Sequence, residues 1–259
     1  MTGAPSFLRP PAGLSGRGLR AWARQVLGAA LFRSSASGPG QYRPSLLHLL
    51  GLAALLLLGM GGIVAMFFWR HYWIPAESMK PTLLIGDFVM VARVSAEEVQ
   101  RGDVIVFRHP MNGSDMIKRL IGMPGDRVQM TDGRLILNGE AVPLEPAGVF
   151  EEVMEPQGPI RSRPRCANGA VEEGAICRKE RFVEVLPGGV QHDVLNIGDA
   201  PGMPDTTGVY SVPEGYFFVM GDNRDNSADS RFDAMDGGLG FVPASNIIGR
   251  ADRILFSSA

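Results

Sequence analysis

A serine, a lysine and a polar loop are the groups in this sequence whose types and spacing could do chemistry together. Ser78 lies between Pro75 and Pro81. Because proline fixes φ and disfavours helix, we expect the serine on an extended or tightly turned segment, where its hydroxyl could act as a nucleophile. The four histidines form no pattern typical of a catalytic triad or a metal site. The base should therefore be a lysine or a carboxylate, and the sequence predicts neither a metal nor another cofactor.

Lysines are scarce, and Lys80, Lys118 and Lys179 are the only three in the chain. Lys80 is two residues from Ser78 and could share its face, but beside Pro81 we expect it to be exposed. Lys118 lies between apolar residues on a strand that we expect to be buried. Burial can lower a lysine pKa from about 10.4 by up to about 3–5 units, which makes the amine a usable base. Composition alone favours a structural, ion-paired lysine at this position, so both interpretations stay open.

The polar loop covers residues 221–231, where all but Gly221 and Ala228 are polar or charged. It follows an apolar strand that we expect over residues 216–220. Asp, Asn, Arg and Ser side chains after a core strand readily form a network of hydrogen bonds and ion pairs. A calcium loop is excluded, because no glycine and closing glutamate fall at the required offsets. A solvated surface loop is the alternative.

The elements that position these groups begin with an uncharged apolar run over residues 46–69. As a helix it would reach about 36 Å, enough to cross a hydrocarbon core of about 30 Å. A buried core helix of this length would show a polar face, and a cleaved signal peptide would start earlier and be shorter. Residues 69–73 are aromatic and basic, which is typical of a membrane–water interface. We predict one transmembrane helix.

Charge is distributed unevenly along the chain. Residues 1–45 contain six arginines and no acid, whereas all 27 acidic residues lie beyond them. This places the N-terminus in the cytoplasm and the rest outside, which in a bacterium is the periplasm. The acidic exterior part has the wrong sign for binding nucleic acid. Residues 17–33 could form an amphipathic helix on the inner leaflet, could be a disordered basic tail, or could belong to an organellar transit peptide.

After the membrane, alternating and β-branched runs predict an exterior part that is mostly β. Glycine follows Asp132 and Asn138, which is a hairpin signal on either side of residues 134–137. Residues 142–207 are rich in Pro, Gly and acids and indicate an insertion or second subdomain. Strands are expected over residues 88–94, 104–107, 116–121, 128–130, 182–185, 194–197, 209–212, 216–220 and 247–256.

Cys166 and Cys177 are the only cysteines, and both lie in this insertion. In an oxidising compartment we expect them to pair in a disulfide, which would stabilise the fold by about 3 kcal/mol. Two free thiols are the alternative. With the scattered His192 they provide too few ligands for a metal site.

Short motifs surround the reactive groups, and their order along the chain is informative. They are Ile74 and Pro75, Ser78 and Met79, residues 81–83, Gly86 and Asp87, residues 101–104, Lys118 and Arg119, Gly122, and residues 124–126, 221–231, 240–243 and 249–251. Any one of them is weak. Together, behind a membrane anchor, they cover most of the exterior part and resemble the bacterial type I signal peptidases (leader peptidases), which are membrane-anchored Ser-Lys endopeptidases.

The resemblance implies a role for each matching position. Ser78 would be the nucleophile and Lys118 the general base, and Ser227 would hydrogen-bond to the lysine and orient it. The network that braces the polar loop would consist of Asp222, Asp229 and Arg231. Shallow pockets for small side chains at the cleavage site would be lined by Ile74, Pro75, Ala76, Met79, Leu83, Met116 and Ile117.

The resemblance also implies a fold and a function. We expect a mostly β, membrane-anchored protein with two antiparallel β-sheet domains, the second inserted into the catalytic one, preceded by one transmembrane helix. The function would be removal of N-terminal signal peptides from exported precursors after small residues, in A-x-A-like sites. The expected parts are the cytoplasmic segment 1–45, the helix 46–69, the catalytic domain of residues 70–126 and 214–259, and the inserted subdomain 127–213.

Expected partners are precursors that bear signal peptides, membrane lipid and the export translocon, for a monomer in the bacterial inner membrane. One departure from the family concerns Ala76, where many members have a serine whose hydroxyl serves the oxyanion hole. One lost donor of this kind can cost about 10²–10³ in rate. Two alternatives remain: another Ser-Lys processing peptidase of this fold, or a membrane-anchored binding module with impaired catalysis, for which Ala76 is the best support.

Overall fold

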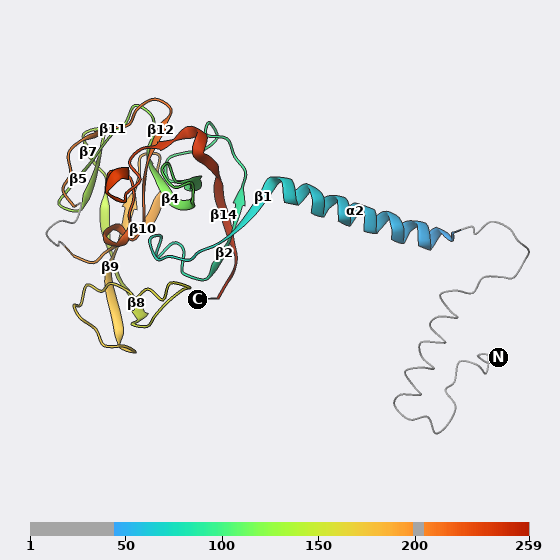
Figure 1. Cartoon of the computed structure of the whole chain (residues 1–259), viewed down its shortest axis with the longest axis horizontal. Coiled ribbons are helices and arrows are strands. Elements are labelled where there is room, and N and C mark those ends of the chain that lie inside the picture. Colours follow the sequence, from blue (N-terminus) through green and yellow to red (C-terminus); the bar gives the residue numbers. More distant parts are fainter. Residues whose placement is uncertain (1–43, 199–204, 259) are drawn as a thin grey trace, which may run out of the picture. The chain divides into compact units, whose positions relative to one another are not determined.

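The computed structural model describes residues 44–198 and 205–258 of the chain (Figure 1). The possible amphipathic helix over residues 17–33 lies outside these ranges, as does nearly all of the basic segment 1–45. The chain divides into two compact units, Met1–Leu58 and Gly59–Ala259.

Helix α2, Leu46–Phe68, corresponds to the predicted span over residues 46–69. Its first part, Leu46–Ile63, is long and apolar enough to cross a membrane, and none of it is buried inside the protein. A soluble protein would bury such a surface in its core. The helix ends one residue earlier than predicted, because Trp69 begins strand β1.

The chain beyond the helix is mostly β, as predicted, and its largest sheet has the strand order β1-β2-β14-β3-β4-β12-β13 (Figure 1). Neighbouring strands of this sheet are antiparallel. The strands are β1 (Trp69–Trp73), β2 (Asp87–Ala92), β3 (Val104–Arg108), β4 (Asp115–Gly122), β12 (Tyr216–Met220), β13 (Val242–Pro243) and β14 (Ile247–Ser257).

Two smaller antiparallel sheets are built from the chain between β4 and β12. One has the order β11-β5-β6-β7 and the other the order β10-β9-β8. The chain therefore leaves the large sheet after β4 and returns to it at β12. These strands are β5 (Arg127–Thr131), β6 (Arg134–Leu137), β7 (Glu140–Ala141), β8 (Leu144–Val153), β9 (Ile176–Val185), β10 (Gln191–Asn196) and β11 (Tyr210–Ser211).

Strand β8 was not predicted, although it is one of the longest in the molecule. Pro146 and Gly148 lie within it, and its register against β9 shifts between Pro146 and Val149. A proline next to a bulge interrupts the alternation by which a strand is recognised in sequence. Among the described residues after α2, the helical elements are 3₁₀ turns: η2 (Arg224–Asn226), η3 (Ala234–Asp236) and η4 (Ala244–Asn246).

Three apolar clusters form the core of the β part. One of them fastens the segment around Ser78 to the large sheet. Its buried members are Ile74, Met79 and Leu83 from that segment, Val89 and Val91 from β2, and Val106 from β3. The position of Ser78 is thus determined by apolar side chains on both sides of it in sequence.

Candidate active site

Ser78 lies on the loop that joins β1 to β2. Backbone hydrogen bonds close this loop at its base, from Ile74 N to Asp87 O and from Gly86 N to Ile74 O, both over 2.9 Å. A third bond attaches its tip, because Asn223 N donates to Ser78 O over 3.1 Å. The nucleophile predicted from the two prolines is therefore held by its own backbone as well as by packing.

Lys118 reaches the serine from β4. Its Nζ donates a hydrogen bond to Ser78 Oγ over 2.5 Å, although the two residues are 40 positions apart in sequence. The lysine side chain is buried, and on its strand it lies opposite Ile105 of β3. Lysine is almost never fully buried unless it is paired. Here the hydrogen-bond partner is a neutral hydroxyl.

The pKa of Lys118 reflects this environment. Burial lowers it from 10.5 to about 8, while the carboxylates of Asp229 and Asp222 act in the opposite direction and the guanidinium of Arg231 adds to the lowering. A base works best when its pKa is close to the working pH. Near pH 8 a large fraction of this amine is neutral and able to accept a proton, which is not true of an ordinary lysine with a pKa of about 10.4.

Lys80, the lysine nearest to Ser78 in sequence, makes its contacts elsewhere. Its Nζ donates hydrogen bonds to the Glu152 carboxylate and, over 2.7 Å, to Gln157 Oε1. The expectation that Lys80 is exposed is wrong, since only 2 % of the residue is accessible. Its charge can be buried because a carboxylate meets it.

Asp222 connects the serine's loop to the lysine's strand. Its carboxylate accepts hydrogen bonds from Arg119 Nε and Nη2 over 2.8 and 2.6 Å, and from Thr82 Oγ1 over 2.5 Å. Arg119 follows Lys118 on β4, and Thr82 lies on the loop of Ser78. One buried carboxylate therefore fixes the two segments that carry Ser78 and Lys118.

Asp229 and Arg231 form the second part of the predicted network. Asp229 accepts hydrogen bonds from Gly221 N over 3.0 Å and from Arg231 Nε and Nη2, both over 2.9 Å. Arg231 Nη2 also donates to Arg224 O over 2.5 Å. Arg224 in turn forms a two-pronged ion pair with Glu184 of β9, over 2.9 and 2.7 Å. The loop 221–231 is thus folded on itself and attached to the three-stranded sheet, and is not a solvated surface loop.

Ser227 is placed differently from the expectation. Its Oγ is buried without a hydrogen-bond partner, so the predicted bond to Lys118 is not formed. The hydroxyl lies instead beside Gly221, where a Cβ would come within 2.3 Å of Ser227 Oγ and 2.5 Å of Ser78 O. Only glycine lets the polar loop and the serine's backbone approach so closely. The orienting role of Ser227 stays a prediction.

The side chains expected to line the substrate pockets differ in burial. Two from the serine's loop are exposed and two from β4 are half-buried, namely Pro75, Ala76, Met116 and Ile117. The other three are buried in the core against β2 and β3, namely Ile74, Met79 and Leu83. The first group can meet a substrate directly, and the second supports the loop from beneath. At Ala76 a methyl group stands where a hydroxyl could have served an oxyanion.

The cysteines and His192 take no part in the contact between Ser78 and Lys118. Cys166, on the connection between β8 and β9, is joined in a disulfide to Cys177 at the start of β9. His192 of β10 places its Nε2 3.3 Å from Glu184 Oε2. Within the part of the chain that the structure describes, no three His, Cys, Asp or Glu side chains gather to hold a metal ion.

Three residues of the site lie within the matching motifs but were given no role from the sequence: Thr82, Arg119 and Asn223. A charged residue inside an apolar strand has to be paired when it is buried. That signal was available for Arg119 and pointed to a carboxylate partner. No local signal marks Asn223, whose backbone N–H reaches Ser78 O and whose Nδ2 donates to Glu77 O over 3.0 Å.

Comparison with known proteins decides the family. Residues 47–256 match the family model described as signal peptidase, peptidase S26. The chain belongs to this family. It is therefore a serine endopeptidase, and the apolar helix α2 suits the membrane anchor of signal peptidases.

Relatives of this S26 peptidase include two curated proteins named signal peptidase I. The one from Pseudomonas fluorescens is 35 % identical over 216 residues, which cover 75 % of this chain and 67 % of the relative. The one from Aquifex aeolicus is 36 % identical over 214 residues, which cover 75 % and 80 %. A crystal structure of a signal peptidase I from Enterococcus faecalis is 26 % identical and covers 59 % of this chain and 96 % of that one, with a TM-score of 0.30.

Proposed function

We propose that this S26 peptidase removes N-terminal signal peptides from exported precursors, with Ser78 as nucleophile and Lys118 as general base. The observation that carries the proposal is the hydrogen bond of 2.5 Å between Lys118 Nζ and Ser78 Oγ. The lowered pKa of Lys118, about 8, supports its role as a base. The relatives named signal peptidase I support the choice of substrate.

The reaction follows from this pair. Neutral Lys118 takes the proton of the Ser78 hydroxyl as Oγ attacks the carbonyl carbon of the scissile peptide bond. The resulting ammonium gives that proton to the leaving amine, so the C–N bond breaks and the mature protein departs. Lys118, neutral again, then takes a proton from the water that hydrolyses the acyl-enzyme. The proton finally returns to Ser78 Oγ, and both side chains end the cycle as they began it.

The edge of β4 offers a place for the substrate. This strand pairs with β3 from Asp115 to Arg119, but with β12 only from Arg119 to Gly122. In the described part of the chain, no strand pairs with the second edge of β4 over residues 115–118, so an extended peptide could add there. The accessible side chains of Pro75, Ala76, Met116 and Ile117 would then restrict the cleavage site to small residues.

The membrane anchor suits such a substrate. A signal peptide has an apolar segment of 7–15 residues that ends shortly before its cleavage site. Held in the same membrane as α2, it would present that site near the membrane surface. We place the helix in the bacterial inner membrane, with the N-terminus in the cytoplasm and the β part in the periplasm. There a monomer in contact with lipid would receive precursors from the export translocon.

Cleavage of a purified precursor by the full-length protein in detergent micelles tests the proposal. Ser78→Ala and Lys118→Met should each abolish cleavage while the near-UV circular dichroism spectrum stays that of the parent. Ser245→Ala and Arg163→Met, at exposed positions, are matched controls that should cleave normally. Turnover retained in Lys118→Met would overturn the choice of base. A precursor left intact by the parent protein would contradict the proposed function and favour a binding module.

A further inference from the structure

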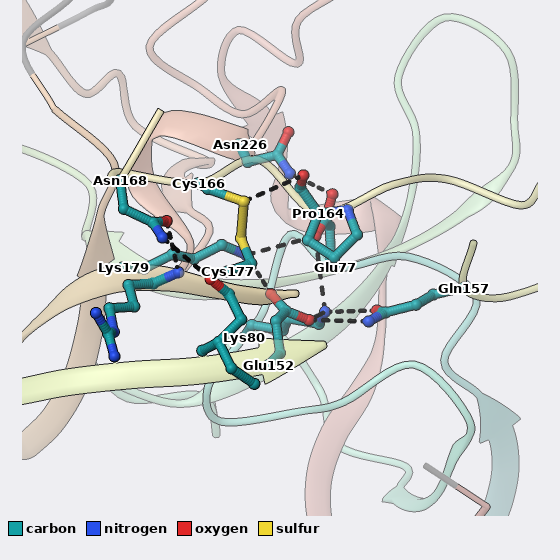
Figure 2. Close-up of a disulfide and its surroundings, with 12 residues drawn as sticks. Glu77, Lys80, Glu152, Gln157, Pro164, Cys166, Asn168, Cys177, Lys179 and Asn226 are labelled. Carbon is teal, nitrogen blue, oxygen red and sulfur yellow. Dashed lines mark hydrogen bonds and ion pairs between the residues drawn. A yellow bond between two sulfur atoms is a disulfide. The ribbon is translucent and has the colours of Figure 1, made fainter. Parts of the chain in front are cut away.

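Two lysines and two glutamates gather at a place that the proton transfers do not use (Figure 2). We call Glu77, Lys80, Glu152 and Lys179 the charge cluster. Glu77 and Lys80 belong to the serine's loop and lie on either side of Ser78 in sequence. Glu152 comes from β8 and Lys179 from β9. The charge cluster therefore joins the nucleophile's loop to the three-stranded sheet.

The contacts within the charge cluster are direct. Both lysines donate hydrogen bonds to Glu152, Lys80 Nζ to Oε2 and Lys179 Nζ, over 2.6 Å, to Oε1. Both ammonium groups also lie 3.6 Å from Glu77 Oε2. Two positive and two negative charges leave the cluster neutral. Gln157 adds an uncharged acceptor for Lys80.

Little water reaches these charges. The exposed fraction of the side chain is 0 % for Lys179, 3 % for Lys80, 11 % for Glu77 and 10 % for Glu152. Burial raises the pKa of Glu152, but hydrogen bonds and charges from Lys179 and Lys80 outweigh that effect, so the pKa lies below its usual value. Removing one member of such a set leaves a buried charge uncompensated, whereas removing an opposite pair together is often neutral.

Glu77 links the charge cluster to the nucleophile. Its Oε1 accepts a hydrogen bond from Asn226 Nδ2 over 2.5 Å (Figure 2). Its backbone O accepts one from Asn223 Nδ2 over 3.0 Å. The backbone of Asn223 also donates to Ser78 O. Glu77, the residue before Ser78, is thus held from two sides. Its carboxylate contacts both the charge cluster and Asn226 of the polar loop, and its backbone O is bonded to Asn223 of the same loop.

The connection between β8 and β9 packs against the same loop. Cys166 and Gln157 lie on this connection. The disulfide joins Cys166 to Cys177 of β9, two residues before Lys179. At Gly158 of this connection, a Cβ would come within 3.0 Å of Pro75 O. Backbone packing and buried charge therefore act together on the segment that carries Ser78.

We propose that the charge cluster positions Ser78, fixing the backbone of residues 77–80 so that Oγ stays within hydrogen-bond reach of Lys118 Nζ. The proposal rests on Ser78 being the nucleophile. The four residues are positioning residues, because they act through the backbone and transfer no proton in the reaction. A misplacement of about 1 Å at a reacting group can cost about 10²-fold in rate.

Single and paired substitutions in the full-length protein test this role. Lys179→Met leaves an unpaired negative charge and should lower kcat on a purified precursor about 10²-fold, with KM changed by less than about threefold. In the double variant Glu152→Gln/Lys179→Met the remaining Glu77 and Lys80 charges balance, so most of kcat should return.

The exposed pair Arg163–Glu173, at 2.6 Å, provides the matched control on the same β8–β9 connection. Arg163→Met and the double variant Arg163→Met/Glu173→Gln should both keep the parent kcat, because an exposed ion pair contributes little. Each variant's folded fraction at the assay temperature is measured by near-UV circular dichroism, so that kcat refers to folded protein.

The outcomes separate this role from the proposed function. Parent-like kcat in Lys179→Met, with Ser78→Ala inactive, would overturn the positioning role and leave the proposed function standing. Cleavage by Ser78→Ala would contradict both the positioning role and the proposed function. A loss of kcat that the double variant does not reverse would show a merely structural role. So would a loss of total activity that only matches the fall in the folded fraction. A changed pH dependence in Lys179→Met would show an effect on Lys118 protonation, and would also overturn the proposal.

Discussion

Lys118 and Lys80 are equally buried, each 2 % exposed, yet their surroundings differ in kind. The hydrogen-bond partner of Lys118 is the neutral hydroxyl of Ser78, and in the described part of the chain no carboxylate forms an ion pair with it. Lys80 is bonded to the Glu152 carboxylate. Burial removes water from both amines, but of the two only Lys80 is bonded to a carboxylate, which balances a buried positive charge. Burial lowers the pKa of a lysine and so favours the neutral amine, which can accept a proton, whereas a carboxylate in an ion pair opposes that effect.

The largest effect on kcat is expected when Lys118 is replaced by arginine. Lys118→Arg keeps the positive charge but cannot lose it, since a guanidinium stays protonated in proteins. We expect kcat for precursor cleavage to fall by about 10⁴-fold or more. Cleavage within tenfold of the parent would show that Lys118 does not act as a base.

Replacing Lys80 should have an intermediate effect. Lys80→Met disturbs the charge cluster but leaves Lys118 in place, so we expect kcat to fall by about 10²-fold and not to vanish. The same precursor assay measures both lysine variants. Complete loss in Lys80→Met together with retained activity in Lys118→Arg would exchange the roles of the two lysines.

The cleavage rate of the parent protein should depend on pH as a lysine base requires. Only the neutral amine can take the serine's proton, and burial lowers the pKa of Lys118 to about 8. The rate should therefore rise about tenfold per pH unit below this value and level off above it. Initial rates measured between pH 6 and pH 9.5 check this expectation. A rate that is independent of pH across that range would contradict a lysine base.

The smallest effect is expected at Thr82, which helps Asp222 to hold the two segments together. Thr82→Val removes the donor to Asp222 Oδ2 but keeps the two bonds from Arg119. Because Arg119 still holds the Asp222 carboxylate, we expect kcat/KM to fall by only about two- to tenfold. Thr206→Val, on an exposed loop, is the control. A loss as large as that of Lys118→Arg would mean that the network does more than hold Lys118 and Ser78 together.

Much of the fold could be predicted from the sequence because its signals are local. The uncharged run that forms α2 and the alternating runs that form β2, β3, β4 and β12 need only composition and periodicity. Strand β8 was not predicted because Pro146 and Gly148 interrupt its alternating pattern. The second edge of β4 is likewise a property of the sheet that no local pattern contains.

The site was predictable only where motifs mark it. Composition alone favoured an ion-paired Lys118 and an exposed Lys80, whereas in the structure both are buried and Lys80 is the ion-paired one of the two. The reason is distance along the chain: Lys80 meets Glu152, 72 positions away, and no local pattern encodes that contact. Ser227 shows the opposite case, because a motif predicts its hydrogen bond to Lys118 and the structure does not form it.

The protonation of Lys118 is the most direct test of the account. The chain contains only three lysines, so NMR of the full-length protein in micelles, with lysine labelled at Cε, gives three signals to follow with pH. We expect a signal that titrates near pH 8 and is missing from the Lys118→Met variant. A Lys118 signal that remains that of the ammonium form up to pH 10 would contradict it.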